Sequence, residues 1–564
     1  MSEMQLITCP DTRCEGCVHR IASHSCELVA SEFSETQKLL LIEPNRNLIH
    51  LPVQGTPSPT EPPWYGNSWE TIYMDSINIL FDNLRHLVDA YIVGPYVSLF
   101  FQDKTTNRAW HHAVPRTRTS LEYSLVHELA QVSSYSVKPK STRVKLQQKL
   151  QDMSADVMTK IESSLPEINS TTRNTISEII AHNSTILRFL FPLILDDEVE
   201  EIYLDRPGSR VYFDHRRLGR ILISWKPKEE DIVRLVTFLR AESNLHLDRR
   251  NPSLKTDITI YNVPLRISAS LPPLAAEGMH LEIRRARSEP YSILDLIRNG
   301  TLSVEAAALL ILAINSRMNV TITGGPGVGK TTLMNALDKT TPQIWRKIYI
   351  EDAIESRLYE DHHQVRIRVD PVDETGGTFD KSTEIVKSLH RSPDYLILGE
   401  IQTAQHSHAL FHSIAAGLCS IQTCHSSSAF SLITRWTKNH NIDESSIALM
   451  DIIVTLERPR PGESFRYVKE IAEVKRSENR GIIDFKGLNL IYDKQNPVVS
   501  DSWSKEGAFH HSANAKGIGN HHVVYDAIVK VLQKKLVDGS NDLSNIGNML
   551  WSNSHPLTSK TSRK

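Results

Sequence analysis

Apolar residues follow spacings that predict a strand, helix, strand order in the second half of the chain. Four short runs rich in β-branched and other apolar side chains are typical of buried strands, at residues 319–323, 347–352, 395–400 and 420–425. Helical spacing precedes the first run, at residues 303–317, and resumes from Lys330. This order predicts a mainly parallel sheet that carries its functional residues at the carboxyl ends of its strands.

The first half predicts shorter elements in a mixed α/β arrangement. Helical periodicity covers residues 69–90, and residues 91–101 and 110–114 are expected to be paired strands. His111 and His112 are neighbours on the second strand and therefore point to opposite faces, which favours a structural role over a pair of ligands. Further helices are expected at 145–165, 171–190 and 228–242, and further strands at 199–205, 211–214, 257–261, 265–270 and 280–284.

Shifts in composition divide the chain into six segments. A Pro-rich and polar stretch at residues 54–63 reads as a linker, and the Ser/Asn/Lys-rich residues 541–564 are expected to be disordered. The predicted segments are a Cys-rich segment at 1–53, the linker at 54–63, a small subdomain at 64–135, a mixed α/β domain at 136–300, a nucleotide domain at 301–495 and a weakly patterned C-terminal region at 496–564.

The first strand of the predicted sheet leads into a glycine-rich loop that fits the phosphate-binding pattern G-x-x-x-x-G-K-[ST] at every fixed position. Glycines let backbone N–H groups approach a phosphate chain and adopt positive φ. Lys330 would neutralise the β- and γ-phosphates, and Thr331 would place its hydroxyl on Mg²⁺. A chance glycine-rich turn is the alternative. The predicted nucleotide ligands are Gly324, Gly325, Pro326, Gly327, Val328, Gly329, Lys330, Thr331 and Thr332.

Polar residues end three other predicted strands. Glu400 follows an apolar strand, where a charge requires solvent, metal or nucleotide, so we expect it to hold Mg²⁺-bound water or polarise the attacking water. Glu351 and Asp352 end their strand in the same way, and one of them could orient or deprotonate that water. His425 could sense the γ-phosphate. The alternatives are acids that cap nearby loops and a structural histidine.

Two arginines, Arg266 and Arg284, lie within apolar β-runs of the mixed α/β domain. An arginine on a strand commonly lies on the solvated face. The alternative is an arm that supplies arginine to a neighbouring nucleotide site and neutralises charge in the transition state.

Charge and hydropathy limit the classes of function. Lys and Arg total 64 against 66 Asp and Glu, a formal net charge of −2, so no basic excess predicts direct nucleic-acid binding. No apolar run reaches the ~18 residues of a membrane span, and the first residues lack a signal-peptide pattern. These features predict a soluble cytoplasmic protein that contacts membranes only through partners.

Four of the six cysteines, Cys9, Cys14, Cys17 and Cys26, are spaced C-x4-C-x2-C-x8-C. Disulfides are not expected in a cytosolic protein, and four thiols at this spacing could bind Zn²⁺ or an iron–sulfur cluster. Four free thiols are the alternative. Cys419 and Cys424 are expected to be core thiols.

These motifs together resemble the secretion-superfamily ATPases of type II secretion, type IV pili and archaeal surface filaments, most closely the archaeal pilus and archaellum assembly ATPases. The resemblance covers residues 90–495. Its pieces are similar to the family's N-terminal subdomain (95–97), the signature of its N-terminal domain (200–208 and 211–217), its Walker A loop (324–331), Asp box (350–352 with Glu355), Walker B (396–400) and His box (423–425).

The resemblance implies a RecA-like ATPase domain preceded by a mixed α/β domain. It implies a ring of identical subunits, usually a hexamer, that binds ATP between the two domains of each subunit. Hydrolysis in the family drives insertion of pilin-like subunits through a polytopic membrane platform protein, so the motor acts at the inner face of the membrane. By the same resemblance Glu351 is the catalytic base, Glu400 the Walker B acid, and Arg266 and Arg284 match arginines that reach the nucleotide.

Three positions depart from the family pattern. His390 stands where the family has an arginine, which is either absent here or displaced by one position to Arg391. Gln402 stands where an arginine commonly follows the Walker B acid, and Leu418 where a histidine is usual. A motor with these changes could hydrolyse ATP slowly. The leading hypothesis is therefore a motor for filament assembly or secretion. A motor of a conjugation or DNA-uptake system and a nucleotide-gated scaffold with little turnover are the alternatives.

Overall fold

The protein forms two compact units, residues Met1–Ser288 and Glu289–Lys564, so the division falls slightly before the predicted boundary at residue 300. The computed structural model describes residues 5–8, 39–43, 46–52, 69–136, 145–286, 290–370, 379–460, 463, 465–479, 482–495, 507–511, 521–539, 543 and 546–550. The predicted linker at 54–63 lies outside these residues. Within them, every helix is too short or too polar to cross a membrane.

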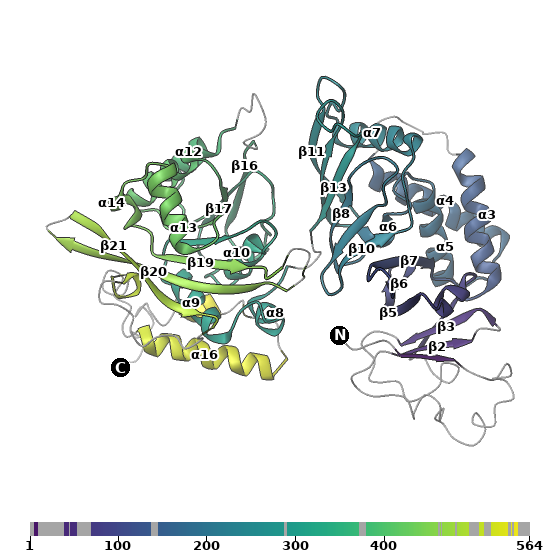
Figure 1. Ribbon diagram of the computed structural model, residues 1–564, viewed down its shortest axis with the longest axis horizontal. Coiled ribbons are helices and arrows are strands. Elements are labelled where there is room, and N and C mark those ends of the chain that lie inside the picture. The colour runs from purple at the N-terminus through teal and green to yellow at the C-terminus, as the bar shows by residue number, and fades with distance from the viewer. Residues whose placement is uncertain are drawn as a thin grey trace, which may run out of the picture. The chain divides into compact units, whose positions relative to one another are not determined.

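The first unit is built on a nine-stranded sheet (Figure 1). All neighbouring strands are antiparallel except β10 and β7, which run parallel. The order is β11 (Ser253–Ile260), β12 (Val263–Ser270), β13 (His280–Arg285), β8 (Val199–Leu204), β9 (Tyr212–His215), β10 (Gly219–Ile223), β7 (Ala109–Pro115), β6 (Tyr96–Asp103) and β5 (Arg85–Val93). A second sheet contains β1 (Gln5–Thr8), β2 (Leu39–Glu43), β3 (Leu48–Pro52) and β4 (Trp69–Tyr73).

Strand β6 shows why the large sheet is covered on both faces. Successive side chains of a strand point to opposite sides. Accordingly Val97 and Leu99 pack in a core with residues of the four-stranded sheet, while Tyr96 and Phe100 pack in the main core with the helices. These helices are α3 (Ser120–Ser136), α4 (Leu146–Ser164), α5 (Ser170–Asn183), α6 (Phe191–Ile194) and α7 (Glu229–Ser243).

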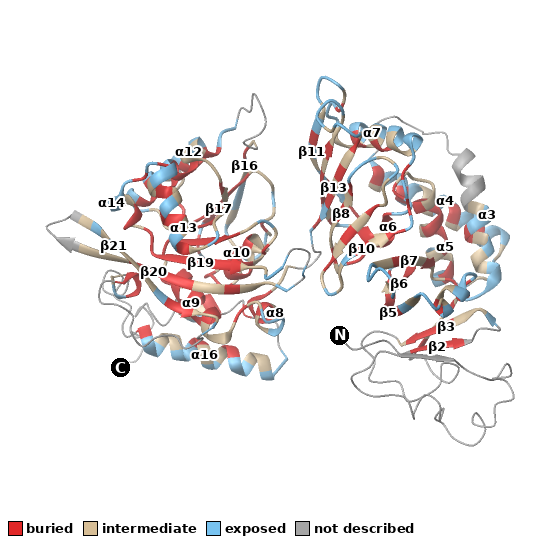
Figure 2. Ribbon diagram, in the orientation of Figure 1, coloured by how far each residue is buried: buried red, intermediate tan, exposed pale blue. Residues whose placement is uncertain are grey.

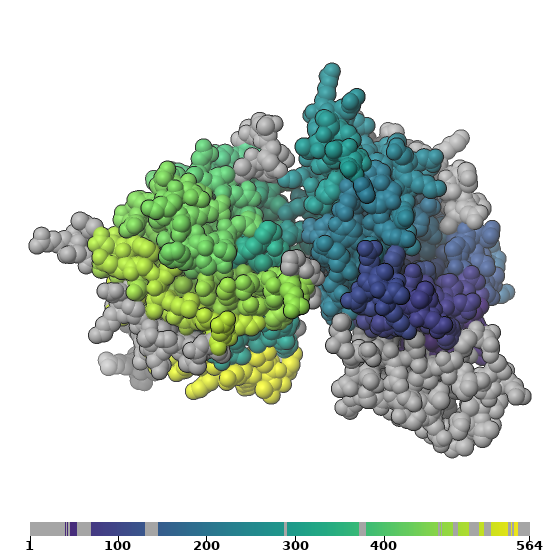
Figure 3. All heavy atoms as spheres, viewed as in Figure 1, coloured from purple at the N-terminus to yellow at the C-terminus, as the bar shows by residue number. Residues whose placement is uncertain are grey.

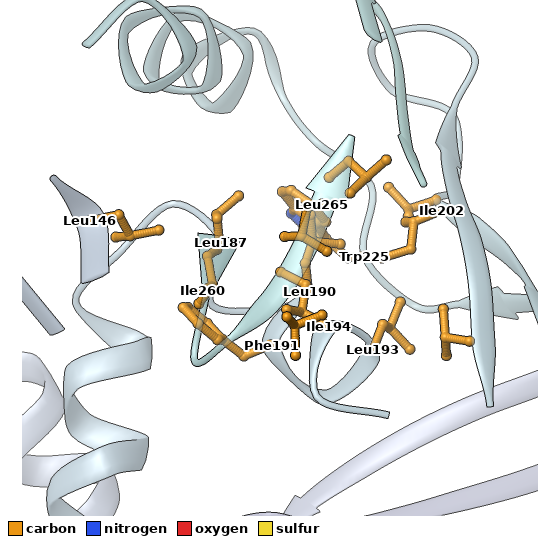
Figure 4. Close-up of a cluster of buried hydrophobic side chains, with 14 of the residues drawn as sticks. Leu146, Leu187, Leu190, Phe191, Leu193, Ile194, Ile202, Trp225, Ile260 and Leu265 are labelled. Carbon is orange, nitrogen blue, oxygen red and sulfur yellow. The ribbon is translucent and has the colours of Figure 1, made fainter. Parts of the chain in front are cut away.

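The main core of the first unit gathers side chains from helices and strands that are far apart in the sequence. In Figure 4, Phe191 and Ile194 of α6 lie near Leu190, Ile260 and Leu265. The red, buried positions of Figure 2 follow the same strands and the inner faces of the helices. This unit therefore has a hydrophobic core of its own.

Two predictions for the first unit are wrong. Residues 69–90 form no continuous helix but contain β4, a short 3₁₀ helix at Ile77–Phe81 and the start of β5. Residues 91–101 are not one strand either, because the chain turns at Gly94, with φ of 54°, between β5 and β6. Pairing with neighbouring strands satisfies the backbone hydrogen bonds of both segments, and the spacing of apolar residues does not reveal such pairing. His111 is buried and bonds the Ser98 hydroxyl at 3.0 Å, as expected for a structural histidine.

The second unit contains an eight-stranded sheet whose first six strands are parallel. Its last two strands add an antiparallel hairpin that extends beyond the helices in Figure 1. The order is β16 (Gln364–Arg368), β15 (Lys347–Glu351), β17 (Tyr395–Ile401), β18 (Ser420–Cys424), β14 (Val320–Gly324), β19 (Ile452–Glu457), β20 (Tyr467–Asn479) and β21 (Ile482–Asp493). This is the predicted mixed α/β architecture with a parallel sheet.

Helices cover both faces of this sheet and give it three layers. One core packs against α8 (Ile293–Arg298), α9 (Val304–Asn315), α10 (Lys330–Asp338) and α16 (His521–Val537). The opposite core packs against α11 (Lys381–Lys387), α12 (Ala404–Ala415), α13 (Ala429–Thr434) and α14 (Glu444–Ile447). Strands with both faces buried explain the continuous apolar runs in the sequence.

The described residues of the C-terminal region contribute to the core of the second unit. Helix α16 packs on α9, and its side chains form the yellow layer on the surface of this unit in Figure 3. Leu543 and Ile546, which fall in the part expected to be disordered, are buried in the same core. Two apolar side chains that contribute to a packed core are enough to anchor a short segment, and a composition-based reading misses them.

Candidate nucleotide-binding and catalytic site

The glycine-rich loop joins β14 to α10 in the conformation that the pattern requires. Gly324, Gly327 and Gly329 have φ of 150°, 66° and 90°, values that L side chains rarely adopt. A Cβ at Gly324 would lie 2.5 Å from the backbone oxygen of Leu456. The loop therefore fits closely against β19 and leads its backbone into the N-terminus of α10.

Lys330, the first residue of α10, folds back over this loop. Its ammonium donates to the carbonyl oxygens of Gly324 at 3.2 Å and Gly325 at 2.8 Å. It also lies 3.2 Å from His425 Nδ1. A lysine buried in this way places its positive charge inside the loop, where the β- and γ-phosphates of a nucleotide would bind.

Glu400 and His425 come from neighbouring parallel strands. His425 follows β18, which lies between β14 and β17, and Glu400 is near the end of β17. Their side chains meet with His425 Nε2 at 2.6 Å from Glu400 Oε1. Burial raises the pKa of Glu400, but its contact with His425, a hydrogen bond from Gln402 and the positive charge of Lys330 together lower the pKa overall. Glu400 is thus held ionised at the mouth of the loop.

Glu351 ends β15 and is almost fully buried. Its carboxylate accepts hydrogen bonds from the backbone N–H groups of Glu355 at 3.2 Å and Ser356 at 2.9 Å, and from the Ser356 hydroxyl. Burial raises its pKa, with the Ser356 hydroxyl working in the opposite direction. Glu351 therefore anchors the segment that follows its strand, and its raised pKa is compatible with a proton acceptor.

Two cations that the sequence did not single out, the buried Lys381 and the half-buried Arg435, bind backbone at these strand ends. Lys381, at the start of α11, bonds Asp352 Oδ1 at 3.1 Å and the Glu400 carbonyl oxygen at 2.9 Å. Arg435 donates to the carbonyl oxygens of His425 and Gln402, each at 2.6 Å. Neither belongs to a recognisable sequence pattern, and only the fold brings them to the site.

Mg²⁺ is implied by the phosphate-binding loop, and the side chains at its mouth suit it. Mg²⁺ prefers oxygen ligands and is commonly held by one or two protein groups together with substrate phosphates and water. The Thr331 hydroxyl and the Glu400 carboxylate would supply such oxygens. The part of the chain that the structure describes contains no group of three or more His, Cys, Asp or Glu arranged to hold a metal without a substrate.

The remaining predicted site residues belong to the first unit or lie outside the described residues. Arg266 and Arg284 are direct neighbours on β12 and β13 in the first unit, and Arg266 Nε lies 3.4 Å from Asp257 Oδ1. The four N-terminal cysteines lie outside the described residues, so the Zn²⁺ or iron–sulfur site stays a prediction. Cys424 is buried, and burial raises the pKa of its thiol to about 12.

Residues 182–454 match the family described as "Type II/IV secretion system protein". That span contains the loop, both acids, His425 and the two arginines of the first unit. This span, just under half of the chain, is a domain of the type II/IV secretion ATPase superfamily.

Relatives of this superfamily domain include an archaeal and a bacterial protein. "Uncharacterized protein MJ0781" of Methanocaldococcus jannaschii is 26% identical over 39% of this chain and 31% of its own length. "Probable conjugal transfer protein TrbB" of Sinorhizobium fredii is 29% identical over 50% of this chain and 86% of its own length. The solved "Crystal Structure of the Pilus Retraction Motor PilT and Bound ADP" covers 66% of this chain and 97% of that structure, at 11% identity and a TM-score of 0.39, which is too low to add to the assignment.

Proposed function

We propose that this chain is an ATP-hydrolysing motor that powers assembly or secretion of type IV pilus-like filaments, working as a ring of identical subunits. One observation carries the proposal. A continuous polar chain runs from the carbonyls of the glycine loop through Lys330 and His425 to the carboxylate of Glu400. The carboxyl ends of adjacent parallel strands bring a phosphate cradle, a sensor and an acid together.

The loop residues bind the phosphates in this proposal. Backbone N–H groups of residues 324–331 and the N-terminus of α10 surround the anion, and Lys330 neutralises charge at its end. Mg²⁺, held by Thr331 and Glu400, would neutralise charge on the phosphate oxygens. Glu400 stays ionised because His425 lowers its pKa, so it remains a ligand over a wide pH range.

Glu351 is the proposed base for the attacking water. It must leave or share its hydrogen bonds with Glu355 and Ser356 to do so. Such a shift is plausible for a catalytic carboxylate because catalytic contacts often form only in the substrate complex. Arg266 and Arg284 are proposed to reach a nucleotide. A polytopic membrane platform protein and pilin-like subunits are the proposed partners, through which the ring would act at the membrane.

Steady-state ATP hydrolysis tests the proposal. The full chain should hydrolyse ATP with Mg²⁺, and Lys330→Ala should abolish both binding and turnover. Glu351→Gln should bind nucleotide but lose turnover by about 100-fold or more, as expected for a missing base. Ser356→Ala is the matched control, because it removes one hydrogen bond to the Glu351 carboxylate and leaves the carboxylate and its two backbone partners in place. The mass in solution, with and without a non-hydrolysable nucleotide, reports whether a ring forms. Wild-type turnover no higher than that of Lys330→Ala would overturn the proposal that the chain is a motor.

A motor of a conjugation or DNA-uptake system is the second candidate. The conjugal transfer name of the TrbB relative supports it. The near-neutral net charge does not predict direct contact with DNA, so such a motor would act on a DNA-transfer machine rather than on DNA. Salt-dependent binding of the purified chain to single- or double-stranded DNA would favour direct contact. Tight nucleotide binding without turnover would favour a scaffold and direct attention to His390, Gln402 and Leu418.

A further inference from the structure

Lys381 is a buried ammonium at the centre of the strand ends, and neither the loop pattern nor the strand-end acids account for it. Its side chain is 2% exposed, and its Nζ lies 3.1 Å from Asp352 Oδ1 and 2.9 Å from the Glu400 carbonyl oxygen. Asp352 directly follows β15, and Glu400 is near the end of β17. One ammonium thus joins two neighbouring parallel strands at the edge where the site lies.

A positive charge at this buried position would be unfavourable without the two oxygen atoms that Lys381 contacts. Burying an ammonium is costly without hydrogen bonds and an opposite charge. Lys381 is also the first residue of α11, where the helix dipole disfavours a cation. Asp380 fixes this helix start by accepting a hydrogen bond from Thr383 N at 2.8 Å. The pair with Asp352 and the bond to the Glu400 carbonyl therefore hold the ammonium in place.

The two strand ends that Lys381 joins are packed tightly, and one of them, β17, pairs irregularly with its other neighbour, β18. The pairing of β17 with β18 shifts register between Leu398 and Glu400. A Cβ placed on Gly399, inside this irregularity, would lie 3.3 Å from the Ile350 oxygen and 3.5 Å from Asp352 Oδ1. The direction of the Glu400 side chain is therefore set where β15 and β17 touch, and Lys381 binds the carbonyl of that same residue.

We propose that Lys381 is a positioning residue, which holds the segment after β15 against the end of β17 and so sets the placement of the Glu351 and Glu400 carboxylates over the glycine loop. This inference rests on the proposed function, because its catalytic consequence requires a site that hydrolyses ATP. Lys381 bonds Asp352 and the Glu400 carbonyl rather than the glycine loop or His425, so it acts through Asp352 and the Glu400 backbone.

Hydrogen exchange of the nucleotide-free full chain tests the structural half. Lys381→Met keeps the length and apolar stem of the side chain but removes its charge and donors. Backbone amides at residues 352–358 and 400–403 should exchange about tenfold faster, while residues 324–331 stay unchanged. Lys387→Met is the matched control, since Lys387 lies on the same helix, pairs with Glu384 and has a side chain that is 56% exposed. Unchanged exchange at both segments would overturn the proposal.

Kinetics test the catalytic half. Lys381→Met should lower kcat by about 10- to 100-fold, as for a misplaced catalytic group, while KM changes by less than about threefold. In the Lys381→Met background, Asp352→Asn should lower kcat little further, because the interaction between Lys381 and Asp352 is already lost. Faster exchange with kcat unchanged would assign Lys381 a purely structural role and overturn the proposal.

Nucleotide affinity separates failure of this inference from failure of the proposed function. If the wild-type chain shows no turnover above Lys330→Ala, the proposed motor function is wrong. The positioning role of Lys381 is then tested by the affinity for a non-hydrolysable ATP analogue, measured with Mg²⁺ and with EDTA. Lys381→Met should reduce the gain in affinity that Mg²⁺ gives by about fivefold or more, with affinity in EDTA unchanged, because only the Glu400 ligand is displaced. An unaltered gain would overturn the positioning role.

Discussion

At the scale of single residues, His425 connects the two charged groups of the site. Its Nδ1 lies 3.2 Å from the Lys330 ammonium and its Nε2 lies 2.6 Å from Glu400. An ammonium can only donate and a carboxylate can only accept. The neutral tautomer with the proton on Nε2 satisfies both contacts at once. A change at the nucleotide end, where Lys330 would bind phosphate, is therefore passed to the Glu400 carboxylate through one ring.

This connection predicts a pH dependence. Burial alone raises the pKa of Glu400, and His425 is the main group that lowers it. In the His425→Ala variant, the histidine no longer opposes the rise in the pKa of Glu400 that burial causes. The pKa of Glu400 should therefore rise, and its ionised form should be lost at a higher pH. The acid limb of the kcat profile should therefore move to higher pH. His408→Ala, an exposed position on α12, serves as the control. An acid limb that stays in place in His425→Ala would show that Glu400 ionisation does not limit turnover.

The sequence predicts some residues of the site and misses others for a physical reason. Glu351, Glu400 and His425 were predictable, because each stands at the end of an apolar strand, where chain order alone fixes its position at the sheet edge. Lys330 was predictable because it is a fixed position of the glycine-loop pattern. Lys381 and Arg435 were not, because they lie on helices, and their partners are backbone carbonyls and a carboxylate on other strands. Backbone acceptors exist at every residue, so no side-chain pattern identifies them.

At the scale of elements, the positions of the strands along the chain were predicted better for the second unit than for the first. Strands β14, β15, β17 and β18 match the predicted apolar runs because both of their faces are buried. Residues 69–90 were misread because Trp69, Ile72 and Leu80 also fit helical spacing. The decisive interaction is the pairing of β4 with β3, including Trp69 opposite Pro52, which is non-local.

The C-terminal segment offers a prediction at the same scale. Gly547 sits against the chain after α10, where an added Cβ would lie 2.5 Å from the Thr340 oxygen and 2.6 Å from the nitrogen of Pro342. Backbone atoms cannot turn away as side chains do, so Gly547→Val should detach the segment that buries Ile546. We expect a loss of about 1–3 kcal/mol in unfolding free energy and a melting temperature lower by about 3–10 °C.

Met549→Ala is the control for this change, because Met549 is 41% exposed in the same helical turn and its truncation should leave the melting temperature nearly unchanged. Hydrogen exchange at residues 546–550 should rise in Gly547→Val alone. Nucleotide affinity should be kept, because the glycine loop precedes α10 and Gly547 contacts the chain after it. Equal melting temperatures for both variants would contradict close packing of Gly547 against the chain after α10.

At the scale of the whole molecule, the chain has two independent sets of core residues. The clusters of the first unit involve residues before Ser288, and those of the second involve residues after Glu289. A unit with its own core is expected to fold alone. The fragment 289–564 contains the glycine loop, Glu351, Glu400 and His425, so it should bind nucleotide with an affinity close to that of the full chain.

The two arginines of the first unit test whether turnover needs the whole chain. Arg284 is exposed and Arg266 is partly exposed, so the double substitution Arg266→Ala and Arg284→Ala should change the unfolding free energy by less than about 1 kcal/mol. If these guanidinium groups neutralise charge on the transferring phosphate, kcat should fall by about 100-fold or more with nucleotide affinity of the second unit kept. The fragment 289–564 should then hydrolyse ATP as slowly as the double variant. Replacing Arg206 and Arg240, two arginines with more exposed side chains, controls for the loss of surface charge. Full turnover in the Arg266 and Arg284 variant would mean that both belong to the solvated face of their strands.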